Sequence, residues 1–458
     1  MRNKKKSHLP AERIMVIGFA AVILLGTLLL SLPCATADGQ RADFLDALFT
    51  ATTSVCVTGL VTVPTAVYWS TFGKVVILFL IQFGGLGIMA CLMMFLLIMR
   101  RRISLQNRKL IQDTYNLPVL KGAVGTIRKL LIGTFTVEAA GAVCYSFYFV
   151  PEYGWGKGIA FSVFHAVSAF CNAGIDIVGE SSFVPFVEKP LINLTTMGLI
   201  ILSGLGFPVW WELLERIGGF FSGKYSRRNF VRGFTLHTKL VLVTTGVLIV
   251  GGAALILLFD WNHPESLGNL DTPSKIMAAF FQSVTTRTAG FETIPQKNFT
   301  ESTSLICMVM MFIGGSPMGT AGGVKTTTIA LLFLMVAAYI RANSDTEAYG
   351  RRVAEENLRS AVVIFFYGMG IVIIATTALV AVTGSPLLDC LYEIVSAVAT
   401  VGLTRSLTPT LPSAGKWIVI VVMFMGRIGP ITLAVALTRK NRNKKARFER
   451  PKQQILVG

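Results

Sequence analysis

Four short polar stretches that end in glycine decide how this sequence is to be read. They are Thr53-Ser54-Val55-Cys56-Val57-Thr58-Gly59, Phe170-Cys171-Asn172-Ala173-Gly174, Thr285-Thr286-Arg287-Thr288-Ala289-Gly290 and Ala399-Thr400-Val401-Gly402. Successive glycines stand 115, 116 and 112 residues apart, and an aromatic residue lies ten positions before each one. Because the same offsets hold four times at even spacing, we interpret them as an internal repeat.

The composition places these stretches in a membrane protein. Hydrophobic residues make up 53% of the 458 residues and charged residues only 14%, which is too few to cover a soluble globule. Apolar runs long enough to cross a bilayer lie at about 14–33, 73–99, 130–150, 189–213, 238–260, 303–340 (with a break), 359–383 and 414–438. We therefore expect an all-α integral membrane protein in which two helices flank each glycine stretch.

The net charge of +18 is concentrated between the helix pairs and at the two ends. Of the 42 lysines and arginines, 31 lie in 1–13, 100–130, 216–239, 341–359 and 439–458. The positive-inside rule then puts both termini in the cytoplasm and the glycine stretches on the outer side. Attraction to anionic lipid explains the basic clusters, and we predict no nucleic-acid partner.

Each repeat therefore consists of a first helix (M1), a re-entrant pore segment and a second helix (M2). The predicted divisions are a cytoplasmic N-terminus at 1–13, repeats at 14–100, 101–215, 216–340 and 341–438, and a cytoplasmic tail at 439–458. Irregular backbone is tolerated at membrane depth only when it is buried in protein or lines water. The four pore segments should therefore converge around one pseudo-fourfold central pore.

The pore segments have the chemistry of a cation filter. A short helix is predicted before each glycine, at 44–53, 159–168, 275–284 and 387–396, and its carboxyl end would favour a cation on the axis. Glycine allows positive φ and lets four backbones crowd together, so that carbonyl oxygens can replace the water around an ion. The candidate filter comprises Val55, Cys56, Val57, Thr58, Gly59, Cys171, Asn172, Ala173, Gly174, Arg287, Thr288, Ala289, Gly290, Ala399, Thr400, Val401 and Gly402.

The second helix of repeat three contains an interruption that we interpret as a gate. Five of the twelve residues at 314–325 are glycine and one is proline, and a regular helix through them is disfavoured by several kcal/mol. The predicted unwound loop lies below the filter. The candidate gate comprises Gly314, Gly315, Ser316, Pro317, Met318, Gly319, Thr320, Ala321, Gly322, Gly323, Lys325 and Arg427.

Four basic residues near the pore need partners or a role. Arg427 follows Gly402 by 25 residues, as Gly315 follows Gly290, so we expect Arg427 at the depth of the loop, bonded to its carbonyls or clamping repeats together. Lys325 either adds to the barrier or extends toward the cytoplasm. Arg287 and Arg405 are expected to brace the filter from behind, paired with acids such as Glu292 or Glu393.

The pieces TSVCVTGL, FCNAGI, TRTAGF and ATVGLT resemble the Trk/Ktr/HKT superfamily of potassium transporters, over nearly the whole chain. Because no extra helices precede repeat one, the chain is more similar to KtrB membrane subunits than to TrkH. The resemblance implies a K⁺ filter, since glycine in the first repeat is associated with K⁺ and serine with Na⁺. It also implies an intramembrane loop and an arginine at 427.

The same resemblance implies a setting and partners. We expect a multi-pass protein of the bacterial cell membrane, a homodimer, and a cytosolic KtrA-like ring of nucleotide-binding regulatory subunits. The transported ion is expected to be K⁺, with Na⁺ as an open alternative or coupling ion, and no covalently bound cofactor is expected. The seven cysteines include no CxxC pair and are expected to be free thiols.

Two other classes of function fit the sequence less well. A Na⁺-coupled secondary transporter working by alternating access would usually show inverted or paired repeats, whereas these four run parallel. A membrane enzyme would need a catalytic constellation, but the four histidines are dispersed and Glu138 is the clearest of few intramembrane acids. We therefore expect no enzymatic activity.

Overall fold

The computed structural model describes residues 11–429 except 88–89, 92, 96–98, 100–122, 225, 227–229, 231 and 344. The predicted N-terminal segment up to residue 10 and the predicted tail at 439–458 lie outside these residues. The α-helices are α1 (Ala11–Leu30), α2 (Phe44–Cys56), α3 (Thr65–Tyr68), α4 (Thr71–Leu86), α7 (Ala123–Cys171), α8 (Pro190–Leu205), α9 (Phe207–Phe221), α11 (Leu236–Asp260), α12 (Thr272–Thr285), α13 (Glu301–Phe312), α14 (Thr326–Ile340), α15 (Glu355–Thr383), α16 (Leu387–Ala399) and α17 (Ser413–Ile428).

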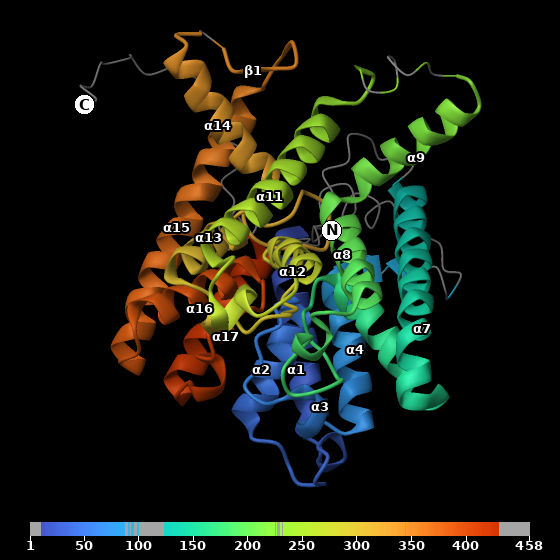
Figure 1. The fold of residues 1–458 in the computed structure, drawn as a ribbon, viewed down its shortest axis with the longest axis vertical. Coiled ribbons are helices and arrows are strands. Elements are labelled where there is room, and N and C mark those ends of the chain that lie inside the picture. Colours follow the sequence, from blue (N-terminus) through green and yellow to red (C-terminus); the bar gives the residue numbers. More distant parts are fainter. Residues whose placement is uncertain are drawn as a thin grey trace, which may run out of the picture.

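The described part of the chain is mainly helical, which confirms the predicted all-α class (Figure 1). Short single turns of helix lie at Pro33–Ala35, Val184–Phe186, Pro264–Gly268, Gln296–Asn298 and Thr408–Thr410. The strands β1 (Glu347–Ala348) and β2 (Arg351–Arg352) form one small antiparallel pair. Four described helices are long and apolar enough to cross a membrane, or five if the bent pair α8 and α9 is one span.

The short helices expected before the four glycines lie within α2, the last part of α7, α12 and α16. In α7 the first helix and the pore helix of repeat two are joined at a kink, where Gly154 has φ 77° and ψ 168°. Polar caps fix where two of the others begin: Asp43 accepts a hydrogen bond from the N–H of Leu45 before α2, and Asp271 accepts one from Ser274 before α12.

The helices pack in a closed circle. Along the chain α2 contacts α4, α4 contacts α7, α8 contacts α12, α13 contacts α16, and α16 contacts α17. The circle closes because α17 packs against α2, which brings the last quarter of the chain beside the first. In Figure 1, α12 lies near the middle of the molecule, between α15 on one flank and α7 on the other.

In the other three quarters the second helix also ends at a glycine, although the sequence predicted an interruption only in the third. α4, α8 and α17 each end immediately before a glycine of positive φ: Gly87 (+80°), Gly206 (+86°) and Gly429 (+82°). After Gly206 the chain turns by 102° into α9, so the predicted continuous span at 189–213 is divided. A Cβ on Gly206 would meet the carbonyl oxygen of Pro317, so the break lets the loop of repeat three approach.

Candidate ion filter and gate

The four glycines of the candidate filter meet at one place. Their φ angles lie in the region that favours glycine, at +99° (Gly59), +62° (Gly174), +82° (Gly290) and +99° (Gly402). A Cβ built on each glycine would collide with a carbonyl oxygen of another pore segment, 2.6 Å away in the case of Gly59. In chain order, these oxygens belong to Ala173, Ala289, Val401 and Thr58. The four segments therefore crowd one another through backbone alone.

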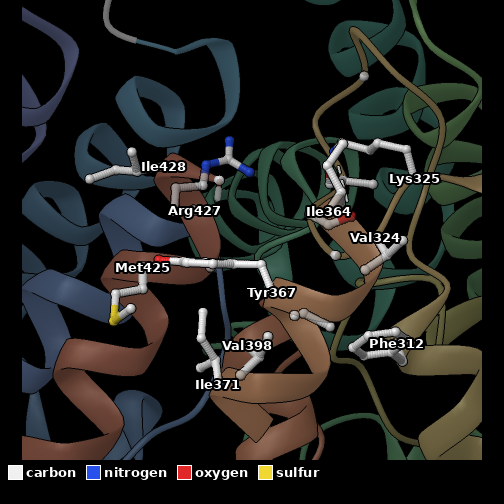
Figure 2. A pocket seen from close by; sticks show the side chains of 18 of the residues that line it. Phe312, Val324, Lys325, Ile364, Tyr367, Ile371, Val398, Met425, Arg427 and Ile428 are labelled. Atoms are coloured by element: carbon white, nitrogen blue, oxygen red, sulfur yellow. Dashed lines mark hydrogen bonds between the residues drawn. The ribbon is translucent and has the colours of Figure 1, made fainter. Parts of the chain in front are cut away.

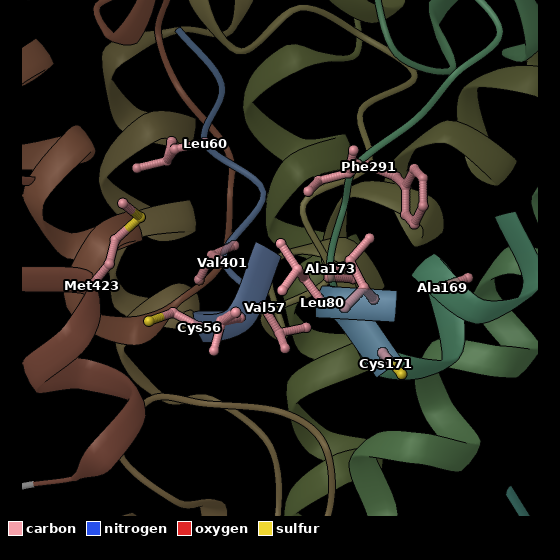
Figure 3. Close-up of a cluster of buried hydrophobic side chains, with 14 of the residues drawn as sticks. Cys56, Val57, Leu60, Leu80, Ala169, Cys171, Ala173, Phe291, Val401 and Met423 are labelled. Atoms are coloured by element: carbon pink, nitrogen blue, oxygen red, sulfur yellow. The ribbon is translucent and has the colours of Figure 1, made fainter. Parts of the chain in front are cut away.

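A second regularity lies two residues before each glycine. Val57, Asn172, Thr288 and Thr400 have positive φ angles of 55°, 60°, 69° and 52°. Such angles are uncommon outside glycine and cluster where surrounding structure enforces them. All seventeen residues of the candidate filter are buried. Figure 3 shows Val57, Ala173 and Val401 gathered from three different segments.

Hydroxyl groups behind the segments hold this backbone in place. The Gly59 N–H donates to Thr53 Oγ1 at 2.9 Å, and the Gly402 N–H donates to Ser396 Oγ at 3.0 Å. In repeat two, Ser168 donates its hydroxyl to the carbonyl oxygen of Ile175. All three hydroxyl residues stand six positions before the filter glycine. This offset recurs in the sequence and could have identified them as supports of the filter.

The two arginines of the filter region lie behind it, but the acid partners predicted for them were wrong. Arg287 reaches Thr245 on α11, where Nη2 donates to Oγ1 at 3.2 Å, and none of the ion pairs among described residues includes it. Arg405 pairs with Asp389, with Nε 2.8 Å from Oδ1. The predicted partner Glu393 instead accepts hydrogen bonds from the hydroxyl groups of Thr404 and Thr408. The other, Glu292, accepts from Gln296.

Arg405 joins the third and fourth repeats, so its loss should destabilise the protein. Its Nη1 also donates to Ser304 Oγ at 2.6 Å and to the carbonyl oxygen of Gln296 at 3.3 Å. Arg405→Ala should lower stability by about 1–3 kcal/mol, because Asp389 would be left half-buried without its partner. Thermal unfolding in detergent measures this. The control Arg352→Ala removes an ion pair whose arginine side chain is 71% exposed, and should change little. Equal shifts in the two variants would contradict the prediction.

The candidate gate forms the predicted unwound loop, and it lies directly against the filter. The Gly322 N–H donates to Thr288 Oγ1 at 3.1 Å, and Thr320 Oγ1 donates to the carbonyl oxygen of Phe170 at 3.0 Å. A Cβ on Gly322 would collide with Thr400 Oγ1. The loop is anchored to α8 as well, since the Ser316 N–H donates to the carbonyl oxygen of Gly204. It therefore contacts the pore segments of repeats two, three and four.

The two basic residues of the gate both bond to loop carbonyls. Arg427 donates from Nη1 to Thr320 at 2.8 Å and from Nη2 to Gly84 on α4 at 2.5 Å. Lys325 Nζ donates to Ala321 at 2.6 Å, so the alternative in which it extends to the cytoplasm is not what the structure has. The two side chains lie on different sides of a cavity of about 350 Å³ (Figure 2). Its other walls are mostly apolar and come from α1, α4, α13, α15, α16 and α17.

On the other side of the filter is a smaller cavity of about 90 Å³, lined by all four filter glycines. The carboxyl groups of Asp176 and Glu292 also line it, from the connections that follow the glycines of repeats two and three. Burial raises the pKa of Asp176 to about 6 and that of Glu292 to about 7, and the nearby charge of Asp176 adds to the rise at Glu292. Both groups therefore change charge near neutral pH.

This fold defines a helical membrane protein in which four pore segments converge at one place, and its sequence matches a family of cation transporters. The sequence matches the family described as TrkH, cation transport protein, over residues 7–446. The chain therefore belongs to the TrkH/Ktr family of cation transport proteins, whose members are transporters rather than enzymes.

Individual relatives place it within this family. It is 36% identical to the potassium/sodium uptake protein NtpJ of Enterococcus hirae, covering 100% of this chain and 99% of that protein. It is 35% identical to the Ktr system potassium uptake protein B of Bacillus subtilis, over 97% of this chain and 96% of the relative. The crystal structure of the potassium transporter TrkH from Vibrio parahaemolyticus has the same fold, with a TM-score of 0.71 at 20% identity over 96% of this chain and 87% of that one.

Proposed function

We propose that this chain carries K⁺ into the cell through a selectivity filter formed by its four pore segments. The observation that supports this most strongly is the closed circle of filter glycines, each packed against a carbonyl oxygen of another segment. Carbonyl oxygens arranged around an axis replace the water shell of an alkali cation. Within the described residues, the buried polar atoms Thr58 Oγ1, Asn172 Nδ2 and Thr400 Oγ1 have no protein partner, as expected where water and ions pass.

The flow of ions is restrained by the candidate gate. Arg427 and Lys325 carry positive charge to the carbonyl oxygens of the loop, where a passing cation would otherwise be stabilised. Opening requires the loop to leave the filter base and Arg427 to release Thr320. On the cytoplasmic side, a KtrA-like ring of nucleotide-binding subunits controls this step, and two copies of the chain form the membrane unit.

The second candidate is a Na⁺-coupled transporter that works by alternating access. The name of the Enterococcus hirae relative, a potassium/sodium uptake protein, keeps Na⁺ in consideration as a transported or coupling ion. The closed circle of helix contacts favours the filter over rocking halves, because it offers no single interface between two halves. A coupled carrier would stop without inward Na⁺, whereas a filter would pass K⁺ alone.

Uptake of radioactive Rb⁺ into liposomes loaded with K⁺ and free of Na⁺ tests the proposed function. The purified protein should accumulate the tracer, and a variant with the loop shortened should do so faster. Liposomes prepared with the same detergent but without protein provide the background. Absence of uptake by both folded proteins, with uptake restored by added Na⁺, would favour the coupled carrier.

The acid groups at the outer cavity predict a pH dependence. Since their pKa values are raised to about 6 and about 7, Asp176 and Glu292 are mostly neutral at pH 5 and charged at pH 8. Negative charge at a pore entrance concentrates cations there, so Rb⁺ uptake at subsaturating concentration should rise several-fold over this range. The double variant Asp176→Asn with Glu292→Gln should flatten the profile, whereas Glu265→Gln, an exposed acid outside this cavity, should leave it unchanged. A profile that keeps its slope in the double variant would contradict the assignment.

A further inference from the structure

The buried carboxyl group of Glu138 has no place in the filter or gate described so far. It lies in the first part of α7, within the membrane region, and is only 5% exposed. We propose that Glu138, together with Gln82 of α4, is a positioning residue that fixes the start of the second filter segment through the thiol of Cys171. This inference rests on the proposed function, because it assumes that residues 171–174 line the ion path.

Three elements meet at this point. Gln82 donates from Nε2 to Oε1 and Oε2 of Glu138, at 3.1 and 3.3 Å. The thiol of Cys171, the last residue of α7, lies 3.8 Å from Gln82 Oε1 and 3.9 Å from Glu138 Oε1, within hydrogen-bonding range for sulfur. The carboxyl and amide oxygens thus provide the acceptors, and the thiol donates to them.

Burying this polar cluster at membrane depth costs free energy, so its presence needs an explanation. A carboxyl group at membrane depth is unfavourable, and apolar side chains of similar volume would fill the space without that penalty. Among the ion pairs of the described residues, none includes Glu138. Its contacts are instead to one amide and one thiol, and the thiol leads straight into the filter.

Cys171 transmits the position of this cluster to the ion path. It is followed by Asn172, whose φ of 60° turns the chain inward, and then by Ala173 and Gly174. On the side of α4, a Cβ added to Gly85 would lie 2.7 Å from the Cβ of Cys171, so the missing side chain of Gly85 lets α4 pack directly against Cys171. Figure 3 shows the light-blue ribbon of α4 beside Cys171. Any sliding of α7 against α4 would therefore move the Ala173 carbonyl that packs on Gly59.

The third repeat uses a similar arrangement at the same offset. Arg287 stands three residues before Gly290, as Cys171 stands three before Gly174. It too is hydrogen-bonded to a side chain of the preceding first helix, Thr245 on α11, and it approaches Gly204 of α8, the second helix of the repeat before. The first helices thus hold the start of the filter segments by polar contacts in both repeats.

The test compares variants that remove the hydrogen-bonding group of Glu138 or Cys171 with variants that keep it. Each variant is purified and reconstituted in liposomes. Glu138→Leu and Cys171→Ala should each lower the preference for K⁺ over Na⁺ by at least about threefold, and the double variant should be no worse than either one, because the two residues act as one unit. The apparent KM for Rb⁺ should rise more than the maximal rate falls. Glu138→Gln retains an acceptor and should behave like the unmodified protein, and Cys171→Ser retains a donor and should keep more of the K⁺ preference than Cys171→Ala.

Two controls separate the possible failures. Tyr145→Phe removes another buried hydrogen bond of the same helix, from the Tyr145 hydroxyl to Thr196 at 2.6 Å, and should lower stability without changing ion preference. Gly174→Ser tests the filter itself. If Gly174→Ser shifts the preference and Cys171→Ala does not, the positioning role is wrong while the proposed filter stands. If neither shifts it, the filter assignment fails and the inference with it. Cys171→Ala decides the matter even if Glu138→Leu does not fold.

Discussion

Replacing Gly59 or Gly290 with serine should lower the preference for K⁺ over Na⁺ by about tenfold, which corresponds to about 1.4 kcal/mol. At Gly59 the new Cβ would lie 2.6 Å from the carbonyl oxygen of Ala173, and at Gly290 it would meet that of Val401. These carbonyls must rotate or withdraw, which changes the geometry that distinguishes a larger ion from a smaller one. Positive φ adds strain, because serine adopts these angles poorly.

Relative flux of Rb⁺ and Na⁺ through purified protein in liposomes measures this preference. Gly384→Ser is a matched control: Gly384 has φ +64° at the end of α15, but a Cβ there meets nothing within 4 Å. It should reduce stability slightly and leave the preference unchanged. Unaltered preference in serine variants of all four filter glycines would refute the filter.

Deleting residues 315–322 should raise basal Rb⁺ flux at least about tenfold, because it removes the loop that we propose to block the base of the filter. The structure indicates that this deletion requires little rearrangement of the backbone. A Cβ built on Gly323 would lie 3.0 Å from the Cα of Gly314, so the two ends of the deleted stretch are already close. Neighbouring Cα atoms in a chain are about 3.8 Å apart, and joining the ends therefore needs little movement.

Arg427→Ala should act in the same direction by a smaller factor, since it removes the bonds to Thr320 and Gly84 but leaves the loop in place. Arg359→Ala provides the control for loss of an arginine, because Arg359 is 77% exposed and its ion pair within the described residues is with Glu355, four residues away. Flux is compared at equal amounts of folded protein, judged by gel filtration. A fall in flux, or no change, in the folded deletion variant would contradict the gate.

The sequence predicted those features that repeat. The four glycines, the helices before them and the interrupted helix of repeat three could be found because their spacing or composition is periodic or extreme. The helix ends at Gly87, Gly206 and Gly429 were not predicted, since glycines in an apolar run are compatible with either a close helix contact or a bend. What decides in favour of a bend at Gly206 is the approach of Pro317, over a hundred residues away in the chain.

The partners of buried charges could not be predicted from local sequence. Arg405 reaches Ser304 and Gln296 across 101 and 109 residues, and it pairs with Asp389 rather than with the nearer Glu393. Likewise, Glu138 meets Gln82 only because α7 packs against α4. Such contacts depend on tertiary packing, and a single sequence carries no signal for them.

The four filter segments differ in sequence, although their backbones turn alike. In a channel assembled from four identical subunits, any substitution appears in every quadrant at once. In this chain, a single substitution changes one pore segment and leaves the other three unchanged. Mutations can therefore change the proposed ion path one segment at a time. A substitution that would abolish transport in a symmetric channel can here alter ion preference without abolishing transport.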